Sequence, residues 1–201
     1  YGKGGHVVAM IAGFMGDVKF RDGVRRYMKA HENGNATSAD FFGAMAEASG
    51  DPRILPAMQS FTDQQGVPLV TFDPDGKGGY RVTQSRYTRL GSTAPAIQWG
   101  IPLCARRLTG KKQCQLLDQQ SGSIRLPGRG AIVPNVGGTG YYRFELPAGE
   151  WDALIAKADK LPGGEALAFD DSLFASFQAG RASAPQLVAG AVKLTSNPDS
   201  Y

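Results

Sequence analysis

Residues Asn135–Leu146 have the sequence NVGGTGYYRFEL, and an earlier stretch, Thr62–Val70, has the sequence TDQQGVPLV. In the first stretch a run of glycines forms a turn that leads into a short strand pattern. In the second, Gly66 separates a helical pattern from a strand pattern. The two stretches therefore bracket a β region and decide how the rest of the chain is divided.

The bracketed region shows about seven short apolar or alternating runs, spaced about 8–15 residues apart and separated by turn residues. We expect strands at 67–72, 80–86, 97–103, 113–117, 123–126, 131–133 and 141–146. Strands in this rhythm predict an antiparallel β-sandwich.

On both sides of the β region, apolar residues recur at steps of three and four, which indicates helices with one buried face. Before it we expect helices over 4–14, from residue 20 to a left-handed stop at Gly34, over 38–49 behind a capping box at Thr37, and over 53–62. After it we expect helices over 150–160 and 165–178, and a last one capped by Ser183. The fold class is therefore α+β: a helical segment, then an antiparallel β-sandwich, then α-helical hairpins.

Composition sets limits on the possible functions. The 201 residues suffice for one or two cores, and the net charge is a mild +4. A small cationic cluster surrounds one expected turn, and we interpret it as a solvated hairpin tip rather than a nucleic-acid site; its members are Arg106, Arg107, Lys111 and Lys112. No apolar run is long enough to span a membrane. The chain starts at Tyr1 rather than Met, which suggests a processed or excised segment.

Several segments, in order, resemble landmarks of the M1 family of zinc aminopeptidases. They are YGKG at 1–4, GNAT at 34–37, FTDQQGVPLV at 61–70, NVGGTGYYR at 135–143, and FDDSL at 169–173 with AGR at 179–181. The resemblance covers nearly the whole chain. It implies the helical end of a thermolysin-like catalytic domain (1–66), a β-sandwich domain (67–147), and the first helices of a C-terminal helical-repeat domain (148–201).

The resemblance also implies one zinc ion in the parent enzyme, held by a His-Glu-x-x-His helix and a further glutamate. This chain has only two histidines, His6 and His31, on different expected helices. His31-Glu32 begins such a motif, but Asn35 stands where the second histidine belongs. We expect no zinc to be bound by this segment, with His6 packing on a helix face and His31 a surface imidazole.

Tyr1 matches the tyrosine that opens Tyr-x-Lys-Gly in the family. The resemblance implies that its hydroxyl donates to the oxyanion of the tetrahedral intermediate in the parent enzyme. For the isolated segment, the alternative is a terminal tyrosine with no catalytic role.

Cys104 and Cys114 flank a possible three-residue hairpin loop, Leu108–Gly110, with Gly110 in the left-handed position. In that register the two cysteines face each other across the strands, close enough for a disulfide. A bridge would indicate an oxidising compartment, such as a periplasm or the extracellular space. The alternative is a pair of reduced cysteines inside the sandwich, compatible with a cytoplasmic protein.

The resemblance thus implies part of an aminopeptidase that removes N-terminal residues from peptides. Its partners would be the remainder of the parent polypeptide and, through it, the peptide substrate. Without zinc ligands or a general base, the segment alone is expected to be inactive. The alternative is a non-catalytic interaction module built from a sandwich and helices.

Overall fold

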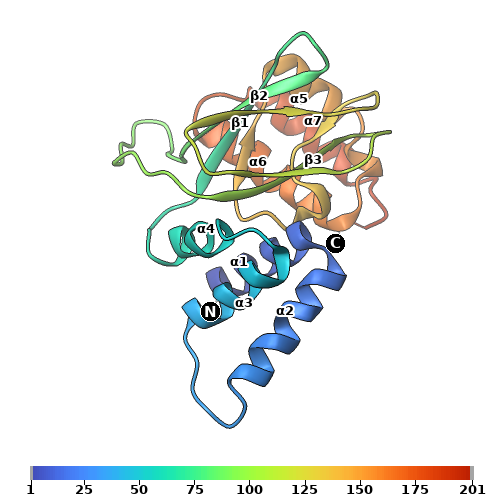
Figure 1. The fold of residues 1–201 in the computed structure, drawn as a ribbon. Coiled ribbons are helices and arrows are strands. Elements are labelled where there is room, and N and C mark those ends of the chain that lie inside the picture. Colours follow the sequence, from blue (N-terminus) through green and yellow to red (C-terminus); the bar gives the residue numbers. More distant parts are fainter. Residues whose placement is uncertain (1, 200–201) are drawn as a thin grey trace.

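The computed structural model describes residues 2–199. Four helices come first, two β-sheets follow, and three helices close the described chain (Figure 1). The predicted α+β class and the order of its parts are confirmed.

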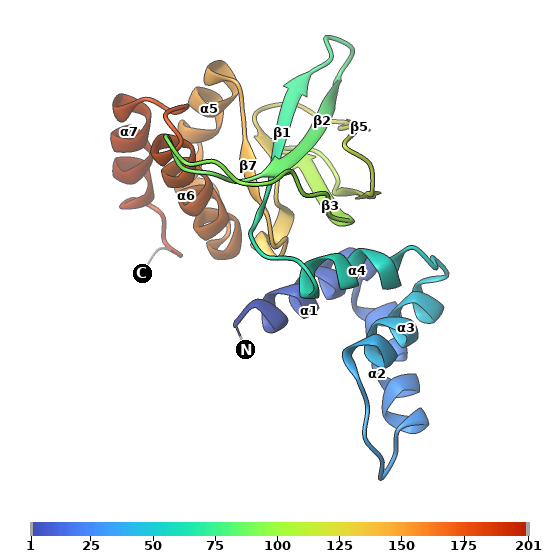
Figure 2. The ribbon, with the colours of Figure 1, turned by 90° about the vertical axis from the view of Figure 1, so that its left-hand side faces the viewer.

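The first four helices are α1 (Gly2–Met15), α2 (Asp17–Ala30), α3 (Ser38–Ser49) and α4 (Ile54–Thr62). Helices α1 and α4 lie next to the sheets, whereas α2 and α3 project away from them as an arm (Figure 2). Gly16, at a φ of 78°, makes the turn between α1 and α2. The buried side chains of α1, α3 and α4 form one apolar layer that continues into the β core.

The capping box before α3 is present: the Thr37 side chain accepts from the Asp40 amide, and the Asp40 side chain accepts from the Thr37 amide. The Asp40 carboxylate also accepts from the Thr37 hydroxyl, and the bonds it accepts from the Thr37 amide and hydroxyl lower the pKa of Asp40. The expected left-handed stop at Gly34 was wrong. Helix α2 ends at Ala30, and Asn33 takes the left-handed conformation, with a φ of 60°. An asparagine tolerates that conformation because its short side chain bonds locally.

The seven strands form two sheets. One has the order β5-β2-β1-β7 and the other β4-β3-β6. Their bounds are β1 (Pro68–Pro74), β2 (Gly79–Arg86), β3 (Ile101–Arg107), β4 (Gln113–Leu117), β5 (Ser121–Arg125), β6 (Ile132–Val133) and β7 (Arg143–Glu145). The pairs are antiparallel except one: β7 joins β1 in parallel, with Leu69 opposite Arg143.

The structure corrects two details of the β region. Strand β3 starts at Ile101 rather than at residue 97, because the Trp99 amide donates to the Gln84 side chain, at 2.8 Å, instead of to a neighbouring strand. Gly110 does not have a positive φ. It is a glycine because a Cβ there would lie 2.1 Å from the Pro127 carbonyl oxygen.

After β7 come α5 (Ala148–Ile155), α6 (Gly163–Gln178) and α7 (Ala184–Leu194). Ser183 caps α7, as predicted, and the structure adds a reciprocal bond to Gln186 that completes a capping box. The helix expected over 150–160 instead ends at Ile155, and a 3₁₀ turn follows at 158–160. Several large apolar side chains of α6 and α7 face solvent: Leu167, Phe174, Phe177, Val188 and Val192. Within residues 2–199, no helix is both long and apolar enough to cross a lipid bilayer.

Candidate functional site

The predicted catalytic residue, Tyr1, lies outside the described residues. The turn of α1 that follows it is held by two bonds. Lys3 donates its Nζ to the Gln64 carbonyl at 2.6 Å, and the His6 Nδ1 lies 2.7 Å from the Gly2 carbonyl. The first bond ties the start of α1 to the segment that leads into β1.

The glycine-rich turn at 135–140 is closed by the side chain of Asn135. Its Nδ2 donates to the Gly140 carbonyl at 3.0 Å, and its Oδ1 accepts from the Gly140 amide at 2.9 Å. Asn135 is buried, and buried backbone groups need hydrogen-bond partners. The side-chain amide of Asn135 supplies these partners to Gly140, where a regular strand would use a neighbouring backbone. Just beyond the turn, the Tyr142 hydroxyl donates to the Pro134 carbonyl at 2.8 Å.

This turn contacts α1 directly. A Cβ at Gly13 would lie 2.5 Å from the Thr139 hydroxyl oxygen, so the helix backbone rests on the threonine. The Tyr141 amide donates to the Met10 sulfur at 3.3 Å, and the Tyr141 ring lies 5.9 Å from the His6 ring. The turn therefore fixes α1, the helix that follows Tyr1 in the sequence.

The same turn contacts α6 on its other side. A Cβ at Gly138 would lie 1.9 Å from the Gly164 carbonyl oxygen, so the two backbones pack against each other without side chains. The Gly137 amide donates to one oxygen of Glu165 at 3.1 Å. The other oxygen of Glu165 accepts from Arg106 of β3 at 2.7 Å, and the glutamate side chain is only 4% exposed. One turn thus joins the first helix, the second sheet and the C-terminal helices.

A hollow of about 400 Å³ opens where these elements meet, between the first turns of α1 and α6. His6 and Tyr141 line one part of it and Asp171 another. Arg143 holds Asp171 through two bonds of 2.9 Å, and its guanidinium stacks over the Tyr87 ring at 4.4 Å. The Asp171 bonds raise the pKa of Arg143, so this arginine stays charged.

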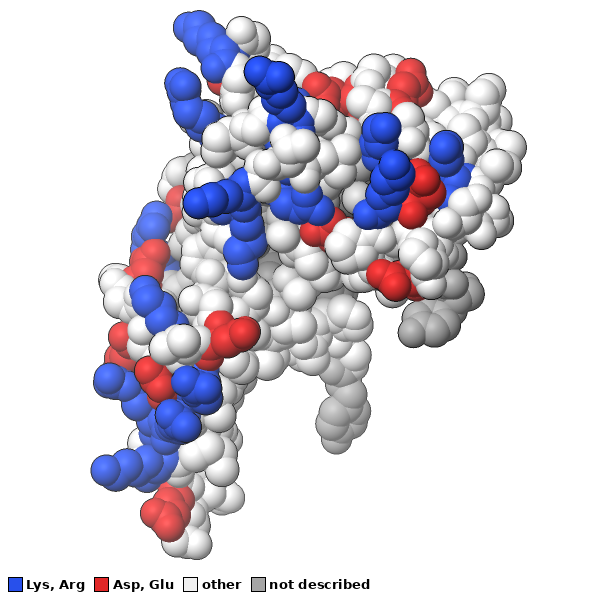
Figure 3. All heavy atoms as spheres, turned by 90° about the vertical axis from the view of Figure 1, so that its right-hand side faces the viewer, with Lys and Arg blue, Asp and Glu red and all other residues white. Residues whose placement is uncertain are grey.

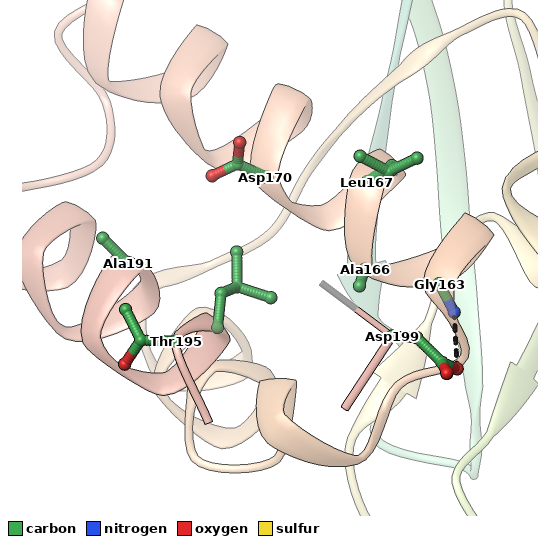
Figure 4. A pocket seen from close by; sticks show the side chains of 8 residues that line it. Gly163, Ala166, Leu167, Asp170, Ala191, Thr195 and Asp199 are labelled. Carbon is green, nitrogen blue, oxygen red and sulfur yellow. Dashed lines mark hydrogen bonds between the residues drawn. The ribbon is translucent and has the colours of Figure 1, made fainter. Parts of the chain in front are cut away.

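A second, more apolar groove of about 300 Å³ lies between α6 and α7 (Figure 4). Its walls are Ala166, Leu167, Ala191 and Leu194, and Asp170 lies along it. Burial, and secondly the Asp171 charge, raise the pKa of Asp170. The two adjacent carboxylates therefore have different surroundings: Asp171 forms the ion pair with Arg143, and Asp170 lies in the groove.

The structure does not bring the two histidines together. His6 lies on α1, whereas His31 follows the end of α2 and packs its ring 5.3 Å from that of Tyr27. Among residues 2–199, no three His, Cys, Asp or Glu side chains gather in a way that could hold a metal ion. The described residues therefore do not fit a zinc centre, and no chemical step is assigned to one here.

Cys104 and Cys114 occupy directly opposed positions on β3 and β4, in the register that the sequence predicts. Their Cα atoms are 4.1 Å apart and their sulfurs are bonded. The loop between the strands is longer than the expected three residues, because β4 begins only at Gln113.

Sequence reasoning missed the buried Glu145. Its Oε1 accepts from the Trp151 indole and from the Ser176 hydroxyl, each at 2.8 Å, while its Oε2 lies 3.7 Å from Arg181. These bonds join β7 to α5 and α6. The only sign in the sequence was an acidic residue at the end of an apolar strand, just before a helix that contains a tryptophan. The partners of Glu145 could not be inferred from it, because they lie 6 to 36 residues away.

The amino-acid sequence is similar to those of known proteins. A model described as the peptidase family M1 domain matches residues 1–64. Tricorn protease-interacting factor F2 of Thermoplasma acidophilum is 28% identical over 189 residues, 94% of this chain and 23% of its own length. Over residues 1–64 the chain is therefore similar to the peptidase domain of family M1.

Other relatives of this chain are named as aminopeptidases. Aminopeptidase 2 of Candida albicans is 28% identical over 158 residues, 77% of this chain and 17% of that protein. Probable aminopeptidase 1 of Saccharolobus solfataricus is 31% identical over 144 residues, 71% of this chain and 18% of that protein. The chain thus spans less than a quarter of the length of each of these relatives.

Proposed function

We propose that the chain is part of a zinc-dependent aminopeptidase that removes N-terminal residues from peptides. The observation that carries the proposal is the family M1 match at residues 1–64, a range that includes Tyr1-Gly2-Lys3-Gly4. The names of the relatives support the same activity.

Within that enzyme, we assign to Tyr1 the donation of a hydrogen bond to the oxyanion that forms as the peptide carbonyl is attacked. A donor fixed before the reaction stabilises charge that develops only in the transition state, so its effect is on kcat. The contacts of α1 with Gln64 and with the turn at 135–140 support this role, because they fix the helix that follows the tyrosine.

The zinc of such an enzyme would polarise the scissile carbonyl and make a bound water acidic. We place its ligands and the general base elsewhere in the parent polypeptide. The 201-residue chain alone is therefore proposed to be inactive. Cys104 and Cys114 favour a periplasmic or secreted enzyme, because disulfides persist in oxidising compartments.

The test uses the full-length enzyme. Tyr1→Phe should lower kcat about 10²- to 10³-fold, the usual effect of losing one oxyanion donor, and leave KM nearly unchanged. Tyr27→Phe is the matched control, because the recorded contacts of Tyr27 are ring contacts that a phenylalanine keeps. An unchanged kcat for Tyr1→Phe would refute the assignment, and robust peptide turnover by the 201-residue chain with added zinc would refute its inactivity.

A further inference from the structure

One end of the β region carries seven cationic side chains, which we call the basic face: Lys77, Arg81, Arg107, Lys111, Lys112, Arg125 and Arg129. The chain has 22 Lys and Arg residues in total. None of the six ion pairs within residues 2–199 involves any of these seven. Six of the seven are exposed, and Arg107 is partly buried.

The basic face is continuous although it comes from three segments. The β2–β5 pairing places Arg125 opposite Gly79, next to the β1–β2 turn. The Arg107 guanidinium lies 5.1 Å from the ring centre of Tyr80 on β2, which joins the β3–β4 hairpin to that strand. Reciprocal bonds between Thr109 and Arg129, of 3.1 and 2.9 Å, tie the hairpin to the loop after β5.

Few carboxylates offset this charge. Asp73 lies opposite Arg81 in the β1–β2 pairing, and Asp75 is close enough to Arg125 and Lys77 to interact with their charges. Glu150 accepts a hydrogen bond from the Tyr80 hydroxyl. Figure 3 shows Lys and Arg dominating the β part of this side, whereas basic and acidic side chains alternate along the helical arm below. The basic face is thus the part of this side where positive charge accumulates.

The composition of the basic face limits the kind of partner. The large exposed apolar side chains belong to other segments, so the face offers no anchor of the kind that dominates protein–protein interfaces. Tyr80 is fully buried, so it offers no ring on which a nucleotide base could stack. Strands and turns form the face, and a recognition helix for a nucleic-acid groove is missing from the described residues there.

A layer of anionic phospholipid headgroups needs neither apolar anchors nor stacking. Such a layer attracts each basic side chain near its surface, and each Lys or Arg raises the affinity of the protein for the membrane about fivefold. We propose that the basic face binds the surface of a membrane containing anionic phospholipids. This proposal does not depend on the peptidase function.

The experiment measures binding of the 201-residue chain to vesicles by sedimentation. Vesicles of phosphatidylglycerol and phosphatidylcholine in equal parts should bind it, and pure phosphatidylcholine should not. The triple variant Lys111→Glu, Arg125→Glu and Arg129→Glu should bind at least about a hundredfold more weakly, because three attractive charges are lost and three repulsive ones are added. Within residues 2–199 the side chains of Lys111, Arg125 and Arg129 make no hydrogen bond, so the fold should persist, which circular dichroism checks.

The matched control reverses three exposed charges on α2: Arg21→Glu, Arg25→Glu and Arg26→Glu. This variant has the same net charge as the first but should keep its affinity within about threefold. Equal losses in both variants would overturn the proposal, because they would reveal only a net-charge effect. Tighter binding to duplex DNA or to a polyglutamate peptide than to the anionic vesicles would overturn it as well, by identifying another class of partner.

Discussion

Glycine residues carry much of the local specificity, for two different reasons. Gly16 and Gly50 adopt left-handed conformations at helix ends, with φ values of 78° and 77°. Gly138 combines a positive φ of 67° with an approach to Gly164 that leaves no room for a side chain. The first kind of glycine is needed for its backbone freedom, and Gly138 is needed for its missing Cβ as well.

Gly138→Ala should therefore be strongly destabilising. The alanine would clash with the Gly164 carbonyl and would hold an unfavourable φ, and we expect a loss of at least about 1–3 kcal/mol in the free energy of unfolding, measured by urea denaturation. Gly43→Ala is the control: it lies inside α3 with open space around it, and should gain up to about 1 kcal/mol. Equal stability of the two variants would contradict the packing described for Gly138.

The sequence predicted local side-chain roles better than distant ones. The capping box at Thr37 follows from two residues three apart, and the cap at Ser183 follows from its place before the helix. The opposed cysteines follow from their equal distances from the turn of one hairpin. The Arg106–Glu165 pair was missed, because its members are 59 residues apart and only the folded sheet and α6 bring them together.

Most helices and strands were predicted close to their observed bounds, because periodicities of 3.6 and 2 mark the buried face of each element. The end of α2, the end of α5 and both ends of β3 were exceptions. The parallel pairing of β7 with β1 was missed, since alternation along a strand contains no information about its neighbour. The late start of β3 was missed for the same reason: it depends on Gln84, a buried side chain of another strand.

The hairpin of β3 and β4 carries a prediction about covalent state. Titration of the denatured, unreduced protein should find no free thiol, and reduction should lower the free energy of unfolding by up to about 3 kcal/mol, the loop-closure effect for about ten residues. A variant with Cys104→Ala and Cys114→Ala should not respond to reductant. Two titratable thiols in the unreduced protein would refute the bridge and remove the argument for an oxidising compartment.

In the molecule as a whole, burial is unevenly distributed. Helix α6 has seven buried residues and is surrounded by α7, β7 and the turn at 136–138. Helix α2, in the projecting arm, has one, Gly23. The arm therefore depends mainly on the contact of α2 with α3.

Hydrogen exchange should show this difference in the 201-residue chain. Amides of α2 should exchange at least about tenfold faster than those of α6, because few buried contacts resist local opening of α2. Mass spectrometry of peptides covering Asp17–Ala30 and Gly163–Gln178 measures both rates in one sample. Equal protection would show that α2 opens only with the whole molecule.

The parallel pairing of β7 with β1 has a consequence for synthesis on the ribosome. Leu69 and its partner Arg143 are 74 positions apart, because 143 minus 69 is 74. At about 5–20 residues per second, the nascent β1 waits about 4–15 seconds for the strand that completes its sheet. During that interval the backbone N–H and C=O groups on one edge of β1 have no partner strand. We therefore expect the nascent protein to bind chaperones that recognise extended chains.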